Sequence, residues 1–363
     1  MPSVHENQFL SNGAGCGRWL DLAGCVLDGH RLTEAEGLAL LRAGDGQLPE
    51  VLAAAFRVRH HWFGDGVKLN FLINAKSGLC GEDCGYCSQS RVSKAEIPRY
   101  NLLDAQHILD GARLSAERRA ATYCIVISGR SPDDGELDVL AQVVPQIKAR
   151  HNLRVCVSPG LLTLEQALRL RACGVDRVNH NLNTSRRFYP LICTTHTYQD
   201  RLDTLHAVRR AGLEICSGGI VGMGEEDADV VELALRLGDL RAEAVPINFL
   251  QPIAGTPLAG VERLDPRYCL KVLALLRLAN PAGELRIAAG REMHLRSLQP
   301  LGLLAADSIF VGDYLTTKGQ APEEDYRMIE DLGFRVIVDV GHTPLTRLAA
   351  RAKMFPGGIT QDH

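Results

Sequence analysis

A regular alternation of short β-rich runs and longer amphipathic segments constrains the fold of this chain more than any other feature. The amphipathic segments at residues 162–174 and 198–212 end on Gly174 and Gly212, and such glycines are typical helix stops. Because strands that alternate with helices form parallel sheets, eight units predict an α/β chain that folds as a (β/α)8 TIM-type barrel. A doubly wound open sheet is the alternative. The β-rich runs are residues 67–74, 122–128, 153–159, 176–182, 213–219, 244–250, 285–289 and 308–312.

The residues before the first β-rich run have a different pattern, which predicts helices. One helix is expected over residues 32–44, where Thr33 and Glu36 have the spacing of a capping box, and a second over residues 48–63. The chain therefore divides into three expected parts, which are an N-terminal helical extension (1–65), the barrel (66–335) and a C-terminal tail (336–363).

Charge and composition exclude several classes of partner. The chain has 40 basic and 43 acidic residues, a net charge of −3, so neither nucleic acid nor an anionic membrane is an expected partner. The first residues, MPSVHENQFLSNGAG, lack the basic and apolar regions of a secretory signal, and no apolar run is long enough to span a membrane. We expect a cytoplasmic protein. Its eleven cysteines would then stay reduced and be available for metal binding or chemistry.

Three of these cysteines form one short motif, GLCGEDCGYCSQS at residues 78–90. Cys80, Cys84 and Cys87 have the spacing C-x3-C-x2-C directly after the first predicted strand, which places them at the C-terminal mouth of the barrel, where active sites lie. A structural zinc site with a fourth ligand from elsewhere is one interpretation. A four-iron cluster held by only three thiolates is the other, and it leaves one iron open to a substrate or cofactor.

Polar residues also interrupt the predicted strands. In the run RVNHNLN, Asn179, Asn181 and Asn183 alternate, so they should share one face, and amides in such a row need hydrogen-bond partners such as a ligand. His180 falls on the opposite face and is expected to be a satisfied core histidine. Five further polar or thiol residues lie mid-strand, Cys124, Cys156, Cys216, Asn248 and Arg286. The remaining cysteines are expected to be small buried residues, Cys16, Cys25, Cys173, Cys193 and Cys269.

Several motifs together resemble the biotin synthases, a family of radical S-adenosylmethionine (SAM) enzymes. The resemblance covers roughly residues 60–335 and implies a sulfurtransferase that converts dethiobiotin to biotin, the last step of biotin biosynthesis. Cys80, Cys84 and Cys87 would hold a [4Fe–4S] cluster that reductively cleaves SAM, and the resulting radical would abstract hydrogen from dethiobiotin. The motifs are NAKSGLCGEDCGYCSQS, TYCIVISGR, DRVNHNLNTS, CSGGIVGMGE, PINFLQPIAGTPL, RIAAGRE and DSIFVGDYLTT.

The resemblance also implies a second cluster and its surroundings. Cys124, Cys156, Cys216 and Arg286 would hold a [2Fe–2S] cluster that gives a sulfide to the substrate. The implied SAM contacts are Tyr86, Asn181, Asn183 and Arg201. The implied substrate contacts are Asn179, Asn248, Thr316 and Thr317. A small flavodoxin- or ferredoxin-like protein would supply electrons, and a homodimer is the implied assembly.

Alternatives exist for single residues and for the whole chain. Arg201 could be a solvated helix charge, and Thr316 and Thr317 could be ordinary turn residues. The chain could be a related radical SAM enzyme that acts on another small substrate without sulfur insertion. It could also be a non-catalytic barrel that is stabilised by zinc and binds a small molecule.

Overall fold

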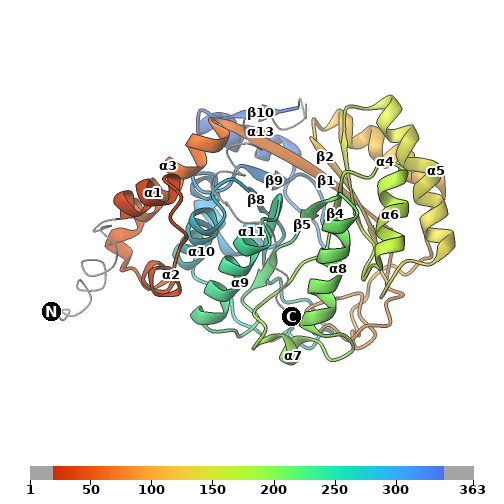
Figure 1. Cartoon of the computed structure of the whole chain (residues 1–363), viewed down its shortest axis with the longest axis horizontal. Helices are drawn as coiled ribbons and strands as arrows, with labels where there is room; N and C mark the ends of the chain where they lie inside the picture. Colours follow the sequence, from red (N-terminus) through yellow and green to blue (C-terminus); the bar gives the residue numbers. More distant parts are fainter. Residues whose placement is uncertain (1–18, 339–363) are drawn as a thin grey trace.

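The computed structural model describes residues 19–338, and within them a parallel sheet closes on itself to form a barrel (Figure 1). The strands around the barrel follow the order β1-β2-β3-β4-β5-β7-β8-β9, and β9 pairs with β1 to close it. The strands are β1 (Gly66–Lys76), β2 (Thr122–Ile127), β3 (Arg154–Ser158), β4 (Arg177–Asn179), β5 (Glu214–Cys216), β6 (Gly219–Val221), β7 (Ala244–Phe249), β8 (Glu284–Ile287), β9 (Ser308–Phe310) and β10 (Arg335–Ile337).

The closure confirms the TIM-type barrel and rejects the open sheet. An open sheet has two free edges, whereas here Leu69 of the first strand lies beside Ile309 of the last barrel strand. Each predicted β-rich run contains a strand, and two runs differ in extent. The fourth run is a strand only as far as Asn179. The fifth run breaks after Cys216 and continues as β6, which pairs with β7.

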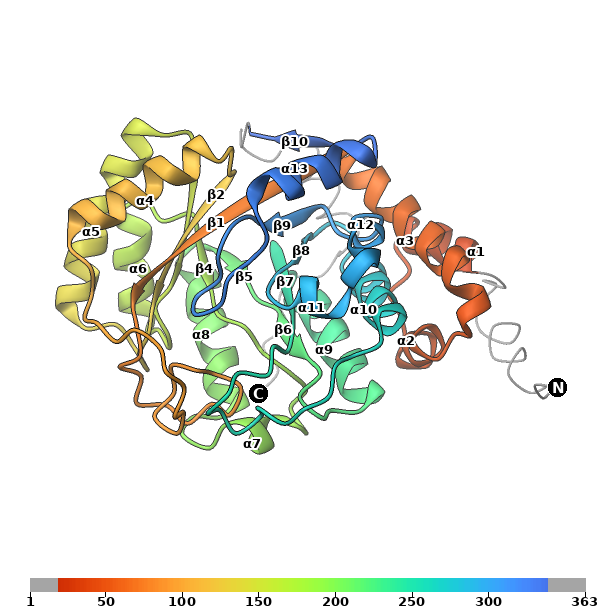
Figure 2. The ribbon, with the colours of Figure 1, turned by 180° about the vertical axis from the view of Figure 1, so that it is seen from behind.

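Helices surround the strands on their outer side (Figures 1 and 2). The predicted stops are confirmed, because Gly174 and Gly212 follow α6 and α8 with φ of 95° and 76°, a backbone region that favours glycine. The barrel helices are α4 (Ala105–Glu117), α5 (Asp134–Arg150), α6 (Leu164–Ala172), α7 (Tyr189–Ile192), α8 (Tyr198–Arg210), α9 (Asp227–Asp239), α10 (Pro266–Ala279), α11 (Arg291–His294), α12 (Gln299–Gly302) and α13 (Pro322–Asp331).

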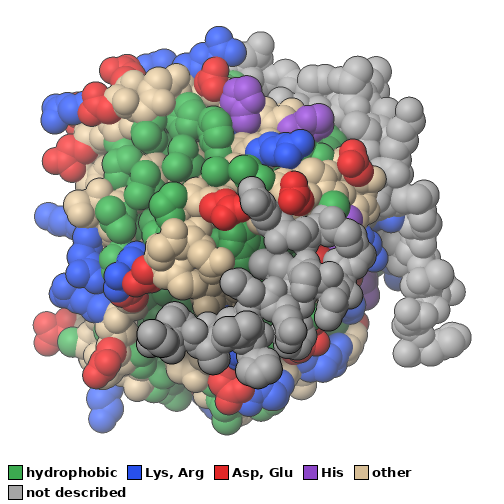
Figure 3. Space-filling model, turned by 90° about the vertical axis from the view of Figure 1, so that its left-hand side faces the viewer, with side chains coloured by type: hydrophobic (Ala, Val, Ile, Leu, Met, Phe, Trp, Pro, Cys, Tyr) green, Lys and Arg blue, Asp and Glu red, His purple; other side chains and the backbone are tan. Residues whose placement is uncertain are grey.

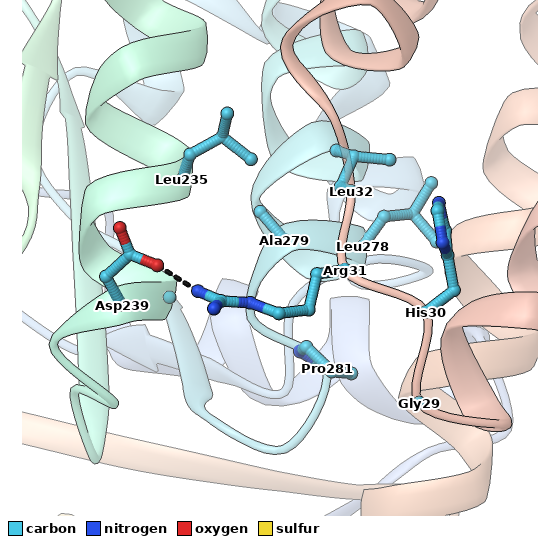
Figure 4. A pocket seen from close by; sticks show the side chains of 10 residues that line it. Gly29, His30, Arg31, Leu32, Leu235, Asp239, Leu278, Ala279 and Pro281 are labelled. Atoms are coloured by element: carbon cyan, nitrogen blue, oxygen red, sulfur yellow. Dashed lines mark hydrogen bonds and ion pairs between the residues drawn. The ribbon is translucent and has the colours of Figure 1, made fainter. Parts of the chain in front are cut away.

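Three helices precede the barrel, which is compatible with the predicted helical extension. They are α1 (Trp19–Leu27), α2 (Glu34–Leu41) and α3 (Leu48–Phe63). The predicted capping box is confirmed, because Glu36 N–H bonds to the Thr33 side chain while the Glu36 carboxylate accepts from Thr33 N–H at 2.8 Å. Of these helices, α2 packs against α9 and α10, α3 packs against α10, and α1 packs against α3. The side chain of Arg31 crosses a surface hollow there to pair with Asp239 of α9 (Figure 4).

The face formed by these helices carries hydrophobic side chains gathered among charged ones (Figure 3). No helix within residues 19–338 is long and apolar enough to cross a bilayer. The predicted C-terminal tail lies outside the described residues from residue 339 onward, and Cys16 also lies outside them.

The main apolar core lies between the strands and the surrounding helices, and the barrel interior differs from it. Branched side chains such as Leu69, Ile125 and Val157 are fully buried in the main core. Inside the barrel, Cys124, Cys156 and Cys216 form a separate small cluster with Ala244. The usual filling of a barrel with branched apolar residues is therefore interrupted where the sequence places thiols mid-strand.

Candidate active site

A cavity of about 380 Å³ opens at the C-terminal ends of the strands. Loops that follow different strands converge on it, as they do at the active-site end of TIM barrels. All the predicted site residues line this cavity except Cys156 and Cys216, which lie beneath it. The predicted residues in its wall are Cys80, Cys84, Tyr86, Cys87, Cys124, Asn179, Asn181, Asn183, Arg201, Asn248, Arg286, Thr316 and Thr317.

The three-cysteine loop follows β1 and lies beside α7, as Figure 2 shows. Gly85 N–H donates to Ile192 O of α7 at 2.8 Å, and a tight turn is closed by Cys87 N–H, which donates to Cys84 O at 3.1 Å. All three thiols are free and at least half-buried. Burial raises the pKa of Cys80, and it raises the pKa of Cys87 to about 11. A bound metal centre would stabilise the thiolates that burial disfavours, so the donor set fits an iron–sulfur cluster.

The three alternating asparagines of the fourth β-rich run all line the cavity, although only Asn179 lies within a strand. Asn179 Nδ2 donates to Asn181 Oδ1 at 3.1 Å, and Gly218 N–H donates to the same oxygen at 3.1 Å. Asn183 has a left-handed backbone, with φ of 71°, which asparagine tolerates better than most residues. Its Nδ2 donates to Tyr86 Oη at 2.6 Å, and this bond fixes the cysteine loop against the end of β4.

The expectation that His180 is a satisfied core histidine is wrong. His180 is only 6% exposed, it lines the cavity, and its Nε2 has no hydrogen-bond partner within residues 19–338. Burial and the nearby positive charge of Arg201 lower the pKa of His180, which keeps the ring neutral. The period-two pattern failed here because the chain leaves the strand after Asn179, so alternate residues no longer point to opposite faces.

The three mid-strand thiols contact one another inside the barrel, where Cys124 also lines the cavity. Cys124 of β2 lies directly beside Cys156 of β3 in the parallel register, and Cys216 completes the cluster. A hydrogen bond from Cys156 lowers the pKa of Cys216 to about 6, against the opposing effect of burial and with support from Arg286. The thiols are therefore close enough to share one inorganic centre, and their donor chemistry fits a two-iron cluster.

Arg286 lies beside these thiols and is 1% exposed. The positive charge of Arg286 is balanced by Glu284, whose carboxylate accepts from Arg286 Nη2 at 2.5 Å. The same carboxylate accepts from Arg177 Nη1 at 3.2 Å and pairs with Lys68 at 3.4 Å. A buried carboxylate thus holds three cations together at the base of the barrel, and no local sequence pattern revealed it.

Arg201 of α8 is a buried cavity residue, so the alternative of a solvated helix charge is wrong. It is 7% exposed and donates to Asn181 O at 2.8 Å. The loop after β9 also reaches the site. Thr316 Oγ1 lies 2.8 Å from Ser88 Oγ of the cysteine loop, and Thr317 Oγ1 donates to Gln251 Oε1 at 2.8 Å. These two hydrogen bonds connect the loop after β9 to the cysteine loop and to Gln251 in the cavity wall.

A polar cluster that no sequence pattern predicted lies beside Cys84. Cys193 is buried as expected, but its Sγ lies 3.7 Å from Cys84 Sγ and 3.3 Å from His196 Nδ1. A hydrogen bond from Cys84 lowers the pKa of Cys193, and one from His196 adds to this effect. Burial acts in the opposite direction, and the resulting pKa of Cys193 is about 4. Ligand atoms of Cys84, Cys193 and His196 lie within 4.8 Å of one another, a spacing that a metal ion can use.

Glu82, inside the cysteine motif, was also missed. Its Oε2 lies 2.5 Å from His196 Nδ1, and its Oε1 accepts from Arg130 Nη1 at 3.1 Å. Burial alone would raise the pKa of Glu82, but hydrogen bonds from Thr195, His196 and Arg130 outweigh it and hold the pKa below its ordinary value. The available signal was the polar run LICTTHTY directly before the helix that carries Arg201.

Comparison with known proteins identifies the family. Residues 76–237 match the Radical SAM superfamily, and residues 246–335 match the Biotin and Thiamin Synthesis associated domain. The chain is 56% identical to the biotin synthase of Rhodopirellula baltica over 87% of this chain and 88% of that one. It is 55% identical to the biotin synthase of Geobacillus kaustophilus over 88% of this chain and 96% of that one. The chain belongs to the biotin synthase family.

Solved structures agree with this family assignment at the level of the fold. A methylornithine synthase superposes with a TM-score of 0.75 at 20% identity, covering 87% of this chain and 97% of that one. The hydrogenase maturase HydG superposes with a TM-score of 0.78 at 16% identity, covering 96% of this chain and 83% of that one. Membership of the Radical SAM superfamily implies a [4Fe–4S] cluster and SAM as cofactors of this biotin synthase family member.

Proposed function

We propose that this protein inserts sulfur into dethiobiotin to form biotin, the last step of biotin biosynthesis, as a SAM-dependent sulfurtransferase. One observation supports this function over that of other radical SAM enzymes. The structure contains two separate sets of three thiols. Cys80, Cys84 and Cys87 lie in the wall of the cavity, and the second set forms a separate cluster inside the barrel, of which only Cys124 reaches the cavity wall. A radical SAM enzyme without sulfur insertion has no evident use for the buried set.

The first set would hold the four-iron cluster. When bound there by Cys80, Cys84 and Cys87, that cluster supplies the electron for the reductive cleavage of SAM. Asn183 and Tyr86, joined by their 2.6 Å hydrogen bond, stand beside this loop and would contact SAM together with Asn181. Within residues 19–338 the guanidinium of Arg201 uses three of its five N–H donors on Asn181, Tyr189 and His196, which leaves two for the SAM carboxylate.

The substrate would lie between these residues and the buried thiols. Asn248 donates to Gly219 O at 3.2 Å and accepts from Ala289 N–H at 3.1 Å, so its amide is held at the cavity wall beside Asn179. Thr316 and Thr317 lie in the cavity wall on the loop after β9, and their hydroxyls would meet the substrate carboxylate.

The second set would hold the sulfur donor. When bound by Cys124, Cys156, Cys216 and Arg286, a [2Fe–2S] cluster supplies the sulfur atom. The support is that the three thiols are 6%, 1% and 0% exposed and contact one another. Leu72 and Phe310 pack against them, and the Arg286 guanidinium lies 5.1 Å from the Phe310 ring centroid. These apolar walls exclude water, and Arg286 places a positive charge beside the thiolates.

The proposal extends to two partners. A small flavodoxin- or ferredoxin-like protein would deliver electrons at the exposed side of the cysteine loop, where Leu79 is 46% exposed. A homodimer is the proposed assembly. Analytical ultracentrifugation tests the assembly, and reduction of the bound cluster by each candidate donor tests the electron source.

Replacing Cys156 by Ala tests sulfur insertion directly. The thiol lies away from the SAM contacts, so SAM cleavage to 5′-deoxyadenosine should persist while biotin formation is lost. Spectroscopy should still detect the four-iron cluster, and the signal of the two-iron cluster should be lost. Iron and sulfide analysis of anaerobically purified protein is the control for metal content. Biotin formation at the normal rate in Cys156→Ala would contradict the proposal, and zinc without iron or sulfide would favour the non-catalytic barrel.

A further inference from the structure

A buried chain of three side chains connects the cysteine loop to Arg201. Glu82 lies between Cys80 and Cys84, and its Oε2 is 2.5 Å from His196 Nδ1. On the other side of the ring, His196 Nε2 is 2.9 Å from Arg201 Nη2. Glu82 and His196 are each 6% exposed and Arg201 is 7% exposed. The three groups thus interact away from bulk water, where hydrogen bonds to charged groups are strong.

The direction of these hydrogen bonds follows from the chemistry of the groups. A guanidinium has only donors, so His196 Nε2 must accept from Arg201. The ring proton therefore lies on Nδ1 and is donated to the Glu82 carboxylate. Glu82 fixes one tautomer of His196, and that tautomer offers Arg201 a lone pair in a defined place.

Arg201 is held in one orientation by bonds on each of its three nitrogens. Besides His196, it donates from Nη1 to Asn181 O at 2.8 Å and from Nε to Tyr189 Oη. Tyr189 is buried and Asn181 is half-buried in the cavity wall, so bonds to both fix the plane of the guanidinium. Its two other N–H groups are then directed by the protein and not by the ligand.

We propose that His196 is a positioning residue that aims Arg201 at the SAM carboxylate, and that Glu82 holds His196 in the tautomer this requires. The inference rests on the proposed role of Arg201. It implies that the cysteine loop and the SAM site are joined by side chains as well as through the cluster itself. A carboxylate within the C-x3-C-x2-C motif thereby contributes to SAM affinity although it is not expected to touch SAM.

SAM affinity of the anaerobically reconstituted enzyme, measured by equilibrium dialysis, tests this inference. His196→Leu removes the hydrogen bonds to Glu82, Arg201 and Cys193 while keeping bulk, and should raise the Kd for SAM roughly ten- to hundred-fold. His196→Gln should restore most of the affinity, because its amide can accept from Arg201 and donate to Glu82. The Kd for dethiobiotin should not change. His206→Leu, on the exposed side of α8, the helix that carries Arg201, is the matched control and should leave the Kd for SAM unaltered.

Two further readouts separate the possible explanations. Arg201→Ala measures the contribution of the guanidinium itself, and iron and sulfide content reports whether the cysteine loop still binds its cluster. The inference is overturned if Arg201→Ala weakens SAM binding and His196→Leu does not, an outcome that leaves the proposed function intact. It is also overturned if His196→Leu and His196→Gln lose SAM binding equally and lose iron in parallel, which indicates a merely structural role. If Arg201→Ala leaves the Kd for SAM unchanged, the assignment of Arg201 fails and the inference fails with it.

Discussion

At the scale of single residues, the chemistry of the site was predictable where it lies within a short motif, and hidden where it depends on distant partners. Cys80, Cys84 and Cys87 are recognisable from spacing alone, and the structure places them on one cavity wall. His196 was not recognisable, because it meets Glu82 across 114 positions of sequence. Such pairs form only after the barrel has closed, and no periodicity within one element encodes them.

Glu284 illustrates the same limit and gives a testable prediction. Replacing Glu284 by Gln leaves Lys68, Arg177 and Arg286 without their shared carboxylate. Breaking a buried ion pair from one side costs about 3–5 kcal/mol, so the free energy of unfolding of the cluster-free protein should fall by that amount in urea titrations. Glu117→Gln is the matched control, because its pair with Arg113 is exposed and should contribute less than about 0.5 kcal/mol.

The pH dependence of stability tests the same carboxylate. Three neighbouring cations, chiefly Arg286, hold the pKa of Glu284 well below its ordinary value although burial opposes them. A carboxyl group with a lowered folded-state pKa stabilises the protein above its unfolded pKa of about 4.3 and loses that contribution as the pH falls. The wild-type free energy of unfolding should therefore decline on acidification below about pH 5, and less steeply in Glu284→Gln. Parallel slopes in the two proteins would contradict this account.

At the scale of elements, the β-rich runs were predictable and their interruptions were not. Runs such as residues 67–74 and 122–128 became strands because branched apolar residues dominate them. The fifth run breaks between β5 and β6 because Gly218 packs against the backbone of β7. A Cβ at that position would lie 1.7 Å from Pro246 O. Tertiary packing of this kind cannot be read from strand propensity.

Gly218→Ala tests whether this close approach determines the break. The neighbouring Pro246 oxygen belongs to the backbone and cannot move aside, so the substitution should destabilise the protein by about 1–3 kcal/mol or more. It should also displace Asn181, whose Oδ1 accepts from Gly218 N–H, and so weaken SAM binding. Gly260→Ala is the control, because a Cβ there meets no atom of residues 19–338 within 4 Å. Unfolding curves of equal midpoint for the two variants would show that the contact does not matter.

At the scale of the whole molecule, eight strand–helix units were enough to predict the closed barrel, and pairing of β1 with β9 confirms it. The fold places the ends of all its strands around one cavity, so residues from Cys80 to Thr317 meet there although they are far apart in sequence. The family resemblance predicted which of them line that cavity. The resemblance did not predict the series of hydrogen bonds from Glu82 through His196 to Arg201, because that series depends on His196 in this particular sequence.

The most direct test of the central claim is product identification after anaerobic reconstitution with iron and sulfide, followed by incubation with SAM, dethiobiotin and a strong reductant. The account predicts biotin, together with 5′-deoxyadenosine and methionine, and its loss on replacement of Cys156. Formation of 5′-deoxyadenosine without any biotin, from protein that contains both iron–sulfur centres, would contradict it.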